Sequence, residues 1–275
     1  MIGTLAMLTV LTLILLGIGW LIGGITGMGI ALIFAVLINF VSYWYSDTIV
    51  LKIYRAKPYD NKELKKIVAD LAQEAEIPAP PLYIVDTQVP NAFATGRNPN
   101  HSAIAVTKGI LDLDKNELKG VLAHEMSHIK NRDTMISTIA ATIAGAISFL
   151  AQMAYYSLFL GGGNDRRGQG NIVGLIIMVI FAPIAATLVR LAVSRDREYK
   201  ADLTGALITK EPQYLASALR KIHDTAKDYP IKGPAATSHL WIVNPFKGDW
   251  FIGMFSTHPP VEKRIARLRE MDGYK

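Results

Sequence analysis

The first 46 residues contain no charged side chain, and this feature limits what the chain can fold into more than any other. Asp47 is the first acidic residue and Lys52 the first basic one, so all 23 acidic and 29 basic residues follow this segment. Spanning a hydrocarbon core takes about 20 apolar residues. We therefore predict two membrane spans, at residues 5–22 and 28–44, with glycines at the turn. A disordered chain is excluded, because 51% of the residues are hydrophobic.

Two more uncharged stretches, residues 136–160 and 172–189, lie on either side of a short polar turn. Their length and close pairing predict a second membrane hairpin, which makes four predicted transmembrane helices. A buried core helix is the alternative for the first stretch, because Ala, Ser, Thr and Gly make it only moderately apolar.

Basic residues predict the orientation. They gather at residues 52–66, 115–132 and 190–200, so the positive-inside rule places residues 47–133 and 194–275 in the cytoplasm of a multi-pass cell-membrane protein. The absence of cysteine means that no disulfide framework argues for an oxidising compartment. We expect the net charge of +6 to face the lipid bilayer rather than a nucleic acid, because no nucleic-acid-binding motif accompanies it.

The first polar block predicts an α+β arrangement. Asp60 and Glu63 form a capping-box pattern at the start of one helix, and Asp114 and Glu117 form another before a helix over residues 115–131. Short runs typical of strands lie between these helices, at residues 82–85, 91–95 and 102–106.

The second polar block predicts mainly helices. One begins near Pro212 and the last follows Pro260, while residues 229–256 are rich in Pro, Gly and aromatic residues and predict long loops, a candidate lid. The chain thus divides into two predicted hairpins and two polar blocks, at residues 1–46, 47–133, 134–193 and 194–275.

The strongest chemical signal is the HExxH pattern HEMSH at residues 124–128, inside a predicted helix. His124 and His128 share one helical face, so both rings can bind one zinc ion. Glu125 is rotated off that face and can instead take a proton from an attacking water molecule. The alternative is an exposed helix that carries two histidines by chance, which composition makes rare.

A catalytic zinc ion needs a third protein ligand, and no further histidine follows the HExxH pattern closely. Glu198 is the best candidate, because it lies in a predicted helix. Asp202, one turn later, can accept the other ring N–H of a ligand histidine. An ion pair of Glu198 with surface bases such as Arg195 and Arg197 is the alternative, and composition leaves the two equally open.

Four segments together resemble the HtpX-type membrane zinc metalloproteases, relatives of the CAAX prenyl endopeptidases. They are NAFATG, VLAHEMSHIKNRD, SRDREYKAD and FSTHPP. The resemblance implies a zincin-like α+β metallopeptidase domain combined with four transmembrane helices, and one zinc ion per chain. It makes His124, His128 and Glu198 the zinc ligands and Glu125 the general base. It also places His258 near the metal as a polariser of the substrate carbonyl, although a helix-capping role fits the two prolines that follow.

The resemblance also implies that the strand NAFAT lines the substrate cleft. We expect its edge to pair with an extended substrate chain, through Asn91, Ala92, Phe93 and Ala94. His101, His223 and His239 have no partner pattern, and we expect them at the surface.

The predicted function is a zinc-dependent endopeptidase that cuts membrane or misfolded proteins at the cytoplasmic face, in protein quality control. A CAAX-type prenyl-protein endopeptidase and a non-catalytic membrane chaperone or scaffold are the alternatives. An ion pathway is disfavoured, because the predicted spans contain no ionisable residue. If the HExxH helix continues into the third span, His128 lies roughly 9 Å from the membrane.

Overall fold

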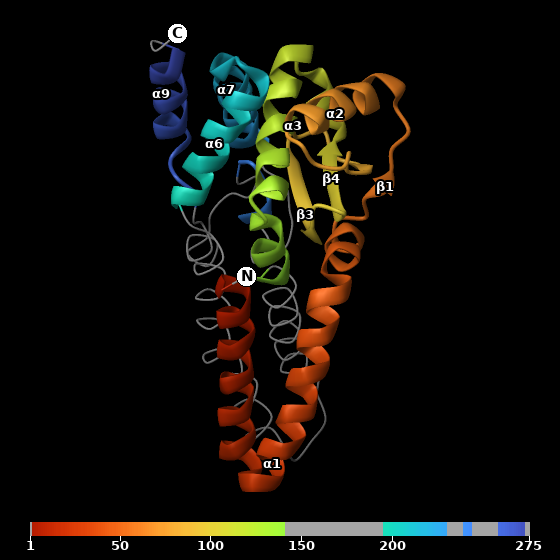
Figure 1. The fold of residues 1–275 in the computed structure, drawn as a ribbon, viewed down its shortest axis with the longest axis vertical. Helices are drawn as coiled ribbons and strands as arrows, with labels where there is room; N and C mark the ends of the chain where they lie inside the picture. Colours follow the sequence, from red (N-terminus) through yellow and green to blue (C-terminus); the bar gives the residue numbers. More distant parts are fainter. Residues whose placement is uncertain (1, 141–194, 230–238, 244–257, 273–275) are drawn as a thin grey trace, which may run out of the picture.

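The computed structural model describes residues 2–140, 195–229, 239–243 and 258–272. It shows a helix-rich body with one sheet, from which the apolar helix α1 (Ile2–Ile53) extends (Figure 1). Nearly all of the second predicted hairpin and most of the candidate lid lie outside the described residues.

Helix α1 folds back on itself, so that its two arms lie side by side and the N-terminus lies next to the body (Figure 1). Gly24 lies at φ 57°, a left-handed conformation that glycine adopts without steric cost. The Asn39 side chain donates to the Thr12 hydroxyl over 2.9 Å, across the two arms. Among the described residues, one helix, Gly24–Tyr45, is long and apolar enough to cross a membrane. The described residues therefore support one of the four predicted spans.

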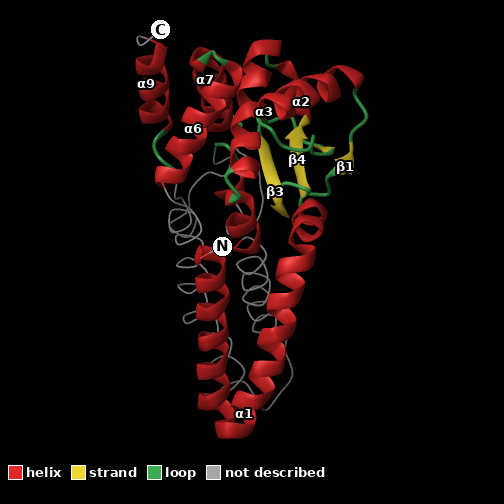
Figure 2. Ribbon diagram, in the orientation of Figure 1, coloured by secondary structure: helices red, strands yellow, loops and turns green. Residues whose placement is uncertain are grey.

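The sheet has four strands in the order β1-β2-β4-β3 (Figure 2). Strand β2 is parallel to β4, and β3 is antiparallel to β4 and forms one edge. The three predicted strands are confirmed, and β1 was not predicted. The bounds are β1 (Lys57–Pro58), β2 (Leu82–Val85), β3 (Ala92–Asn98) and β4 (His101–Thr107).

Helices from both polar blocks share one apolar core, although the sequence between the blocks is long. Leu215, Leu219 and Ile222, predicted to lie on one face of their helix, are all buried in it together with Ile265 and Leu268. The bounds are α2 (Lys62–Glu74), the short 3-10 helix η1 (Lys108–Asp112), α3 (Lys115–Lys130), α6 (Arg195–Thr209), α7 (Pro212–Asp228) and α9 (Val261–Asp272).

Helix α3 begins as predicted, because the Asp114 and Glu117 side chains form a complete capping box. It ends at Lys130, and a new helical segment, residues 133–140, begins two residues after its C-cap. Arg132, between the two, lies at φ 59°, in the left-handed region that stops a right-handed helix. The predicted helix over residues 115–131 is confirmed, and the condition that it continues unbroken into the third apolar stretch is not met.

Helix α2 is capped by Asn61, not by Asp60 as the sequence pattern suggested. The backbone of Asn61 is extended, and its side-chain oxygen accepts from the Leu64 N–H over 2.9 Å. Asp60 is mostly exposed and pairs with Lys65. The capping pattern was displaced by one residue, because Asn and Asp are almost equally good caps.

Replacing Asn61 by Ala should destabilise the protein by about 1 kcal/mol, because one N–H of the first helical turn loses its acceptor. For a protein of this size, the melting temperature should fall by roughly 2–4 °C. Asp60→Ala is the matched control and should leave it within about 1 °C, since a surface ion pair contributes little. Equal losses in both variants would contradict the assignment of the cap.

Candidate metal centre

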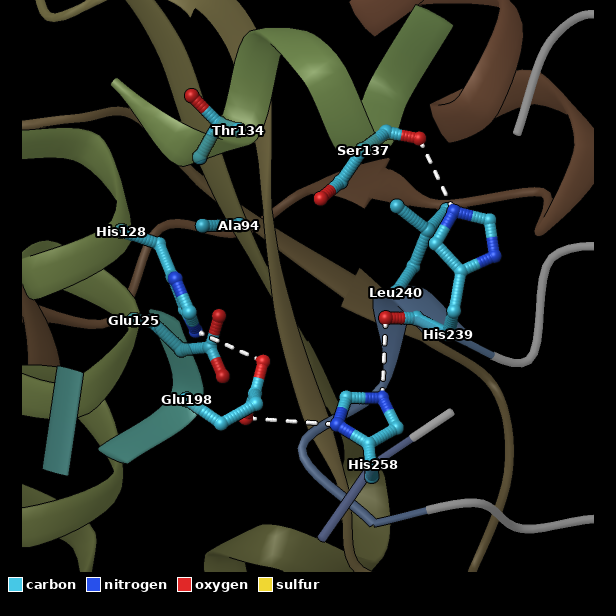
Figure 3. Close-up of a pocket in the computed structure, with 9 residues that line it drawn as sticks. All are labelled: Ala94, Glu125, His128, Thr134, Ser137, Glu198, His239, Leu240 and His258. Atoms are coloured by element: carbon cyan, nitrogen blue, oxygen red, sulfur yellow. Dashed lines mark hydrogen bonds and ion pairs between the residues drawn. The ribbon is translucent and has the colours of Figure 1, made fainter. Parts of the chain in front are cut away.

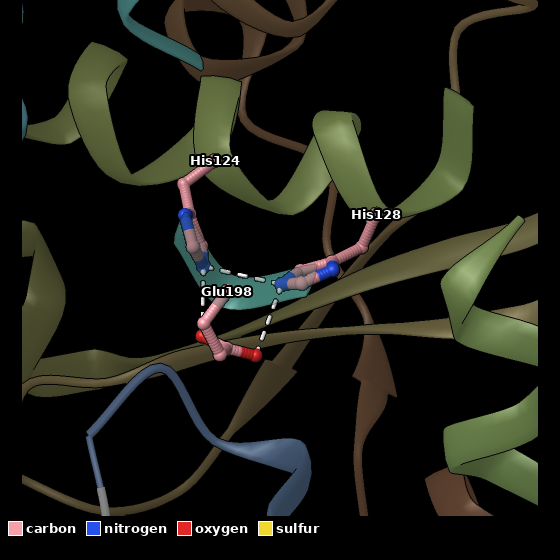
Figure 4. A group of neighbouring side chains, drawn as sticks. All are labelled: His124, His128 and Glu198. Atoms are coloured by element: carbon pink, nitrogen blue, oxygen red, sulfur yellow. Dashed lines mark hydrogen bonds and ion pairs between the residues drawn. The ribbon is translucent and has the colours of Figure 1, made fainter. Parts of the chain in front are cut away.

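Helices α3 and α6 bring His124, His128 and Glu198 together (Figure 4). The Nε2 atoms of the two rings lie 3.2 Å apart. Glu198 turns one carboxylate oxygen to each ring, at 3.7 Å from His124 Nε2 and 3.6 Å from His128 Nε2. Ligand atoms around a tetrahedral zinc ion lie roughly 3.3 Å apart, given bonds of about 2.0–2.1 Å. The three groups thus have the spacing that a single metal ion requires.

Glu198 shows that the centre is suited to a cation. Its Oε2 atom is buried and accepts no hydrogen bond in the described structure. A buried carboxylate oxygen needs facing positive charge, and here the Arg264 Nη1 and His258 Nδ1 atoms lie 3.7 and 3.4 Å from it on one side. Two imidazole nitrogens and this oxygen therefore form a fitting donor set for a metal ion.

Each ring is held from behind by a carboxylate. Nδ1 of His124 lies 3.0 Å from Asp202 Oδ1, and Nδ1 of His128 lies 3.4 Å from Asp133 Oδ2. A carboxylate on Nδ1 fixes the ring so that Nε2 faces the metal. The position of Asp202 is the one that its spacing on α6 suggested.

Asp133 was missed by the sequence analysis. On an uninterrupted helix, a residue five positions after His128 would be rotated away from it by roughly 140°. The left-handed residue Arg132 turns the chain, and Asp133 comes back onto the His128 ring. The sequence feature that could have indicated Asp133 is an acidic residue directly after the HExxH helix.

The two histidines of the cluster have opposite pKa shifts. Burial lowers the pKa of His124 to about 4, although Asp202 opposes it, so this ring is neutral, as a metal ligand must be. Burial alone would lower the pKa of His128, but the carboxylates of Asp133 and Glu198 outweigh it and raise it to about 9. Burial alone would raise the pKa of Glu198, but His258 and His128 hold it well below its usual range. The carboxylates therefore favour a positive charge at His128, and a metal ion bound there would take the place of the proton.

Glu125 is buried beside the ligands but turned toward the sheet. Burial raises its pKa to about 7, with Glu198 adding to the effect and the backbone N–H of Ala94 opposing it by donating to the carboxylate. A carboxyl group with a pKa near neutrality can both accept and release a proton under cellular conditions.

A small cavity opens beside these groups and holds about one water molecule, at about 20 Å³ (Figure 3). His258 lines it, with Nδ1 at 3.4 Å from Glu198 Oε2 and Nε2 at 3.1 Å from the His239 carbonyl oxygen. His239 lines it too and is 4% exposed, so its expected surface position is wrong. The full lining is Ala94, Glu125, His128, Thr134, Ser137, Glu198, His239, Leu240 and His258.

The predicted substrate strand contributes only one residue to this cavity, Ala94. Asn91 is buried, and its side-chain amide donates to the Val243 carbonyl oxygen over 2.7 Å. The Ala92 carbonyl oxygen accepts from the Ile242 N–H over 3.1 Å, at the free edge of β3. Phe93 points to the face of the sheet opposite to that of Ala92 and Ala94, as strand alternation requires. There it packs with other aromatic rings, those of Tyr54 and Trp241.

The alternative of a surface position for Glu198 is excluded, because it is 6% exposed and faces both histidines. Arg264 is a further buried member that the sequence analysis did not single out. Its guanidinium group donates twice to Asp202, over 2.9 and 2.7 Å.

Comparison with known proteins agrees with this geometry. A model of peptidase family M48 matches residues 58–272. A protein named Protease HtpX homolog from Pyrococcus furiosus is 56% identical over 266 residues, which cover 95% of this chain and 92% of the relative. One of the same name from Aquifex aeolicus is 53% identical over 267 residues, covering 94% and 88%. The crystal structure of S. mikatae Ste24p is a remote likeness, with a TM-score of 0.45 and 16% identity, covering 86% of this chain and 57% of that one.

The purified chain should bind one divalent transition-metal ion, which a chelator removes. His124→Ala and Glu198→Ala should each weaken metal affinity by at least about 100-fold, more than loss of an outer partner costs. His101→Ala is the matched control, because His101 is exposed, and should bind as the unmodified chain does. The measurement is the metal content after dialysis against increasing chelator concentrations. Full metal retention in His124→Ala would refute the assignment of His124 as a ligand.

Proposed function

Because this chain belongs to peptidase family M48 and is a metalloprotease, we propose that it is a zinc-dependent endopeptidase that cuts membrane or misfolded proteins at the cytoplasmic face of the cell membrane. The observation that carries the proposal is the position of Glu125. It lies between the His124–His128–Glu198 cluster and the edge strand β3, so a base, a metal and a peptide-binding edge can meet at one point.

The donor set favours zinc. Two imidazole nitrogens and one carboxylate are a known ligand set of catalytic zinc ions, which keep a fourth position open. A zinc ion bound here would polarise the scissile carbonyl group and make a water molecule acidic.

The protein's own groups then move the proton and hold the substrate. Glu125 takes a proton from the attacking water and passes it to the leaving amine, for which a pKa near 7 is well suited. The Ala94 N–H keeps its carboxylate in place. His258 lies on the other side of Glu198, with Nδ1 at 3.4 Å from Oε2, and in this proposal its ring turns to donate to the developing oxyanion. The substrate chain lies along the outer edge of β3 beyond Ala92, whose carbonyl oxygen is already bound by the Ile242 N–H.

The site lies close to the membrane in this proposal. The apolar span Gly24–Tyr45 ends in an aromatic cluster, typical of the interface between bilayer and water. Arg97, on β3, donates to the Trp44 carbonyl oxygen over 3.0 Å, and its guanidinium group lies 5.5 Å from the Trp44 ring centre. Arg97 lies three positions after Ala94, or roughly 10 Å along a strand.

This distance supports substrates that are themselves in the membrane. A peptide bond beside Ala94 would be about 10 Å above the aromatic belt, within reach of segments that emerge from the bilayer. The basic residues that flank the apolar stretches favour the cytoplasmic side. The intact ligand cluster with Glu125 beside it argues against a non-catalytic scaffold.

Glu125→Gln should retain zinc and lose cleavage of an unfolded protein such as casein by about 10²–10⁴-fold, because the base is removed and the ligands stay. The unmodified chain should lose activity with a chelator and regain it with zinc. Glu117→Gln is the control, since Glu117 is a buried glutamate on the same helix that binds Ser217 and Lys221 away from the cluster. A Glu125→Gln variant with full zinc and full activity would rule out the mechanism.

In liposomes, a model substrate tethered by a transmembrane helix should be cut at least about tenfold faster than its soluble form, because tethering raises its effective concentration at the site. Cleavage should be fastest at bonds that lie within a few extended residues of the bilayer, at about 3.3 Å each. Moving the same bond outward on a long Gly/Ser spacer is the control. Equal rates for tethered and soluble substrates would contradict the proposed position of the site.

A further inference from the structure

Arg264, on α9, is 1% exposed and contacts Asp202, the segment 239–243 and, with Nη1 at 3.7 Å from Oε2, the ligand candidate Glu198. We propose that Arg264 is a positioning residue that orients the metal ligand His124 through Asp202 and also holds the segment 239–243 against the edge of β3. The proposal rests on the proposed function, because His124 is taken as a metal ligand.

The first connection runs through Asp202. The guanidinium group donates from Nε to Asp202 Oδ2 over 2.9 Å and from an Nη atom to Oδ1 over 2.7 Å. The same Oδ1 atom lies 3.0 Å from His124 Nδ1. Such a two-point contact fixes both the position and the plane of the carboxylate. The carboxylate in turn fixes the side of the His124 ring that carries its proton, and Nε2 is left for the metal.

The guanidinium group also touches the His124 ring directly. One Nη atom lies 3.4 Å from Nδ1 and 3.3 Å from Nε2. Nearly equal distances to both ring nitrogens mean that it lies against the ring and does not point at one lone pair. The ring is thus held by Arg264 as well as by Asp202.

The second connection reaches the substrate edge. The other Nη atom donates to the Ile242 carbonyl oxygen over 2.9 Å. The N–H of Ile242 in turn donates to the Ala92 carbonyl oxygen on β3. One side chain therefore links the metal ligand to the segment that lies on the strand edge, and its loss should affect metal binding and substrate binding together.

An ammonium group cannot replace this guanidinium group. Lysine carries a compact charge without the planar fork, so it cannot bind both Asp202 oxygens and the Ile242 carbonyl in the same geometry. Arg267 is a natural comparison on the same helix. It is exposed, and its guanidinium group stacks 4.0 Å from the ring centre of Tyr199, on α6 next to Glu198.

The test measures zinc affinity of the full chain in detergent by competition with a chelator, together with melting temperature and with KM and kcat on casein. R264Q should weaken zinc binding by about 10–100-fold, the usual cost of losing an outer partner, and raise KM as well. R264K should fall in between, because it restores charge but not geometry. R267Q should match the unmodified chain.

A double-variant cycle with D202N separates positioning from general stability. If Arg264 acts through Asp202, R264Q/D202N should bind zinc no more weakly than the weaker single variant. The double variant removes both charges of the Arg264–Asp202 pair, so it should be less destabilised than R264Q alone, which leaves Asp202 unpaired; both lose the longer contact of Arg264 with Glu198.

Two results would overturn the positioning role while leaving the proposed function intact. They are a folded R264K or R264Q variant with unchanged zinc affinity, and zinc-affinity losses that add in R264Q/D202N. An unmodified chain that binds no zinc would overturn the proposed function and the positioning role together.

Discussion

The burial of several carboxylates at one point is the constraint on which the rest of this structure depends. Glu125, Glu198, Asp202 and Asp133 are each 9% exposed or less, and they surround two imidazole rings. Uncompensated charge of this kind costs several kcal/mol for each ion. Arg264 supplies one fixed cation among the described residues, and the space between the rings suits another. Helices from both polar blocks must therefore stay packed together for the charges to be balanced.

This requirement explains how the chain is assembled. The close approach of α6 to α3 occurs at Gly205, where an added Cβ atom would lie 3.1–3.2 Å from the His124 backbone. The absence of a side chain at this position lets Glu198 and Asp202 reach the histidines. Helix α9 then brings Arg264 to the site, while Arg97 on β3 ties the sheet to the apolar helix α1 through Trp44.

Local signals in the sequence were reliable where one short segment decides the outcome. The capping box of α3, three strands and the apolar faces of α7 and α9 follow from spacing within one turn or one strand, and the structure has them. The predictions failed where two alternative local conformations have nearly equal free energy. Asn61 and Asp60 compete as caps of α2, and the break at Arg132 has no strong sequence signature. The burial of His239 depends on contacts with residues far away in the sequence.

The sequence by itself determined the apolar hairpin, the HExxH helix and its two histidines, because each depends on periodicity or on residue chemistry alone. Spacing left Glu198 open between a metal ligand and a surface ion pair, and only the family resemblance made it a ligand. Tertiary structure decided which groups meet. It turned Asp133 back onto His128, placed His258 beside Glu198 and His239 in the lining of the same cavity, and brought Arg264 onto Asp202 across 62 residues of sequence. Spacing along a chain cannot predict such contacts, because they arise only when separate helices pack to bury apolar surface and share their charges.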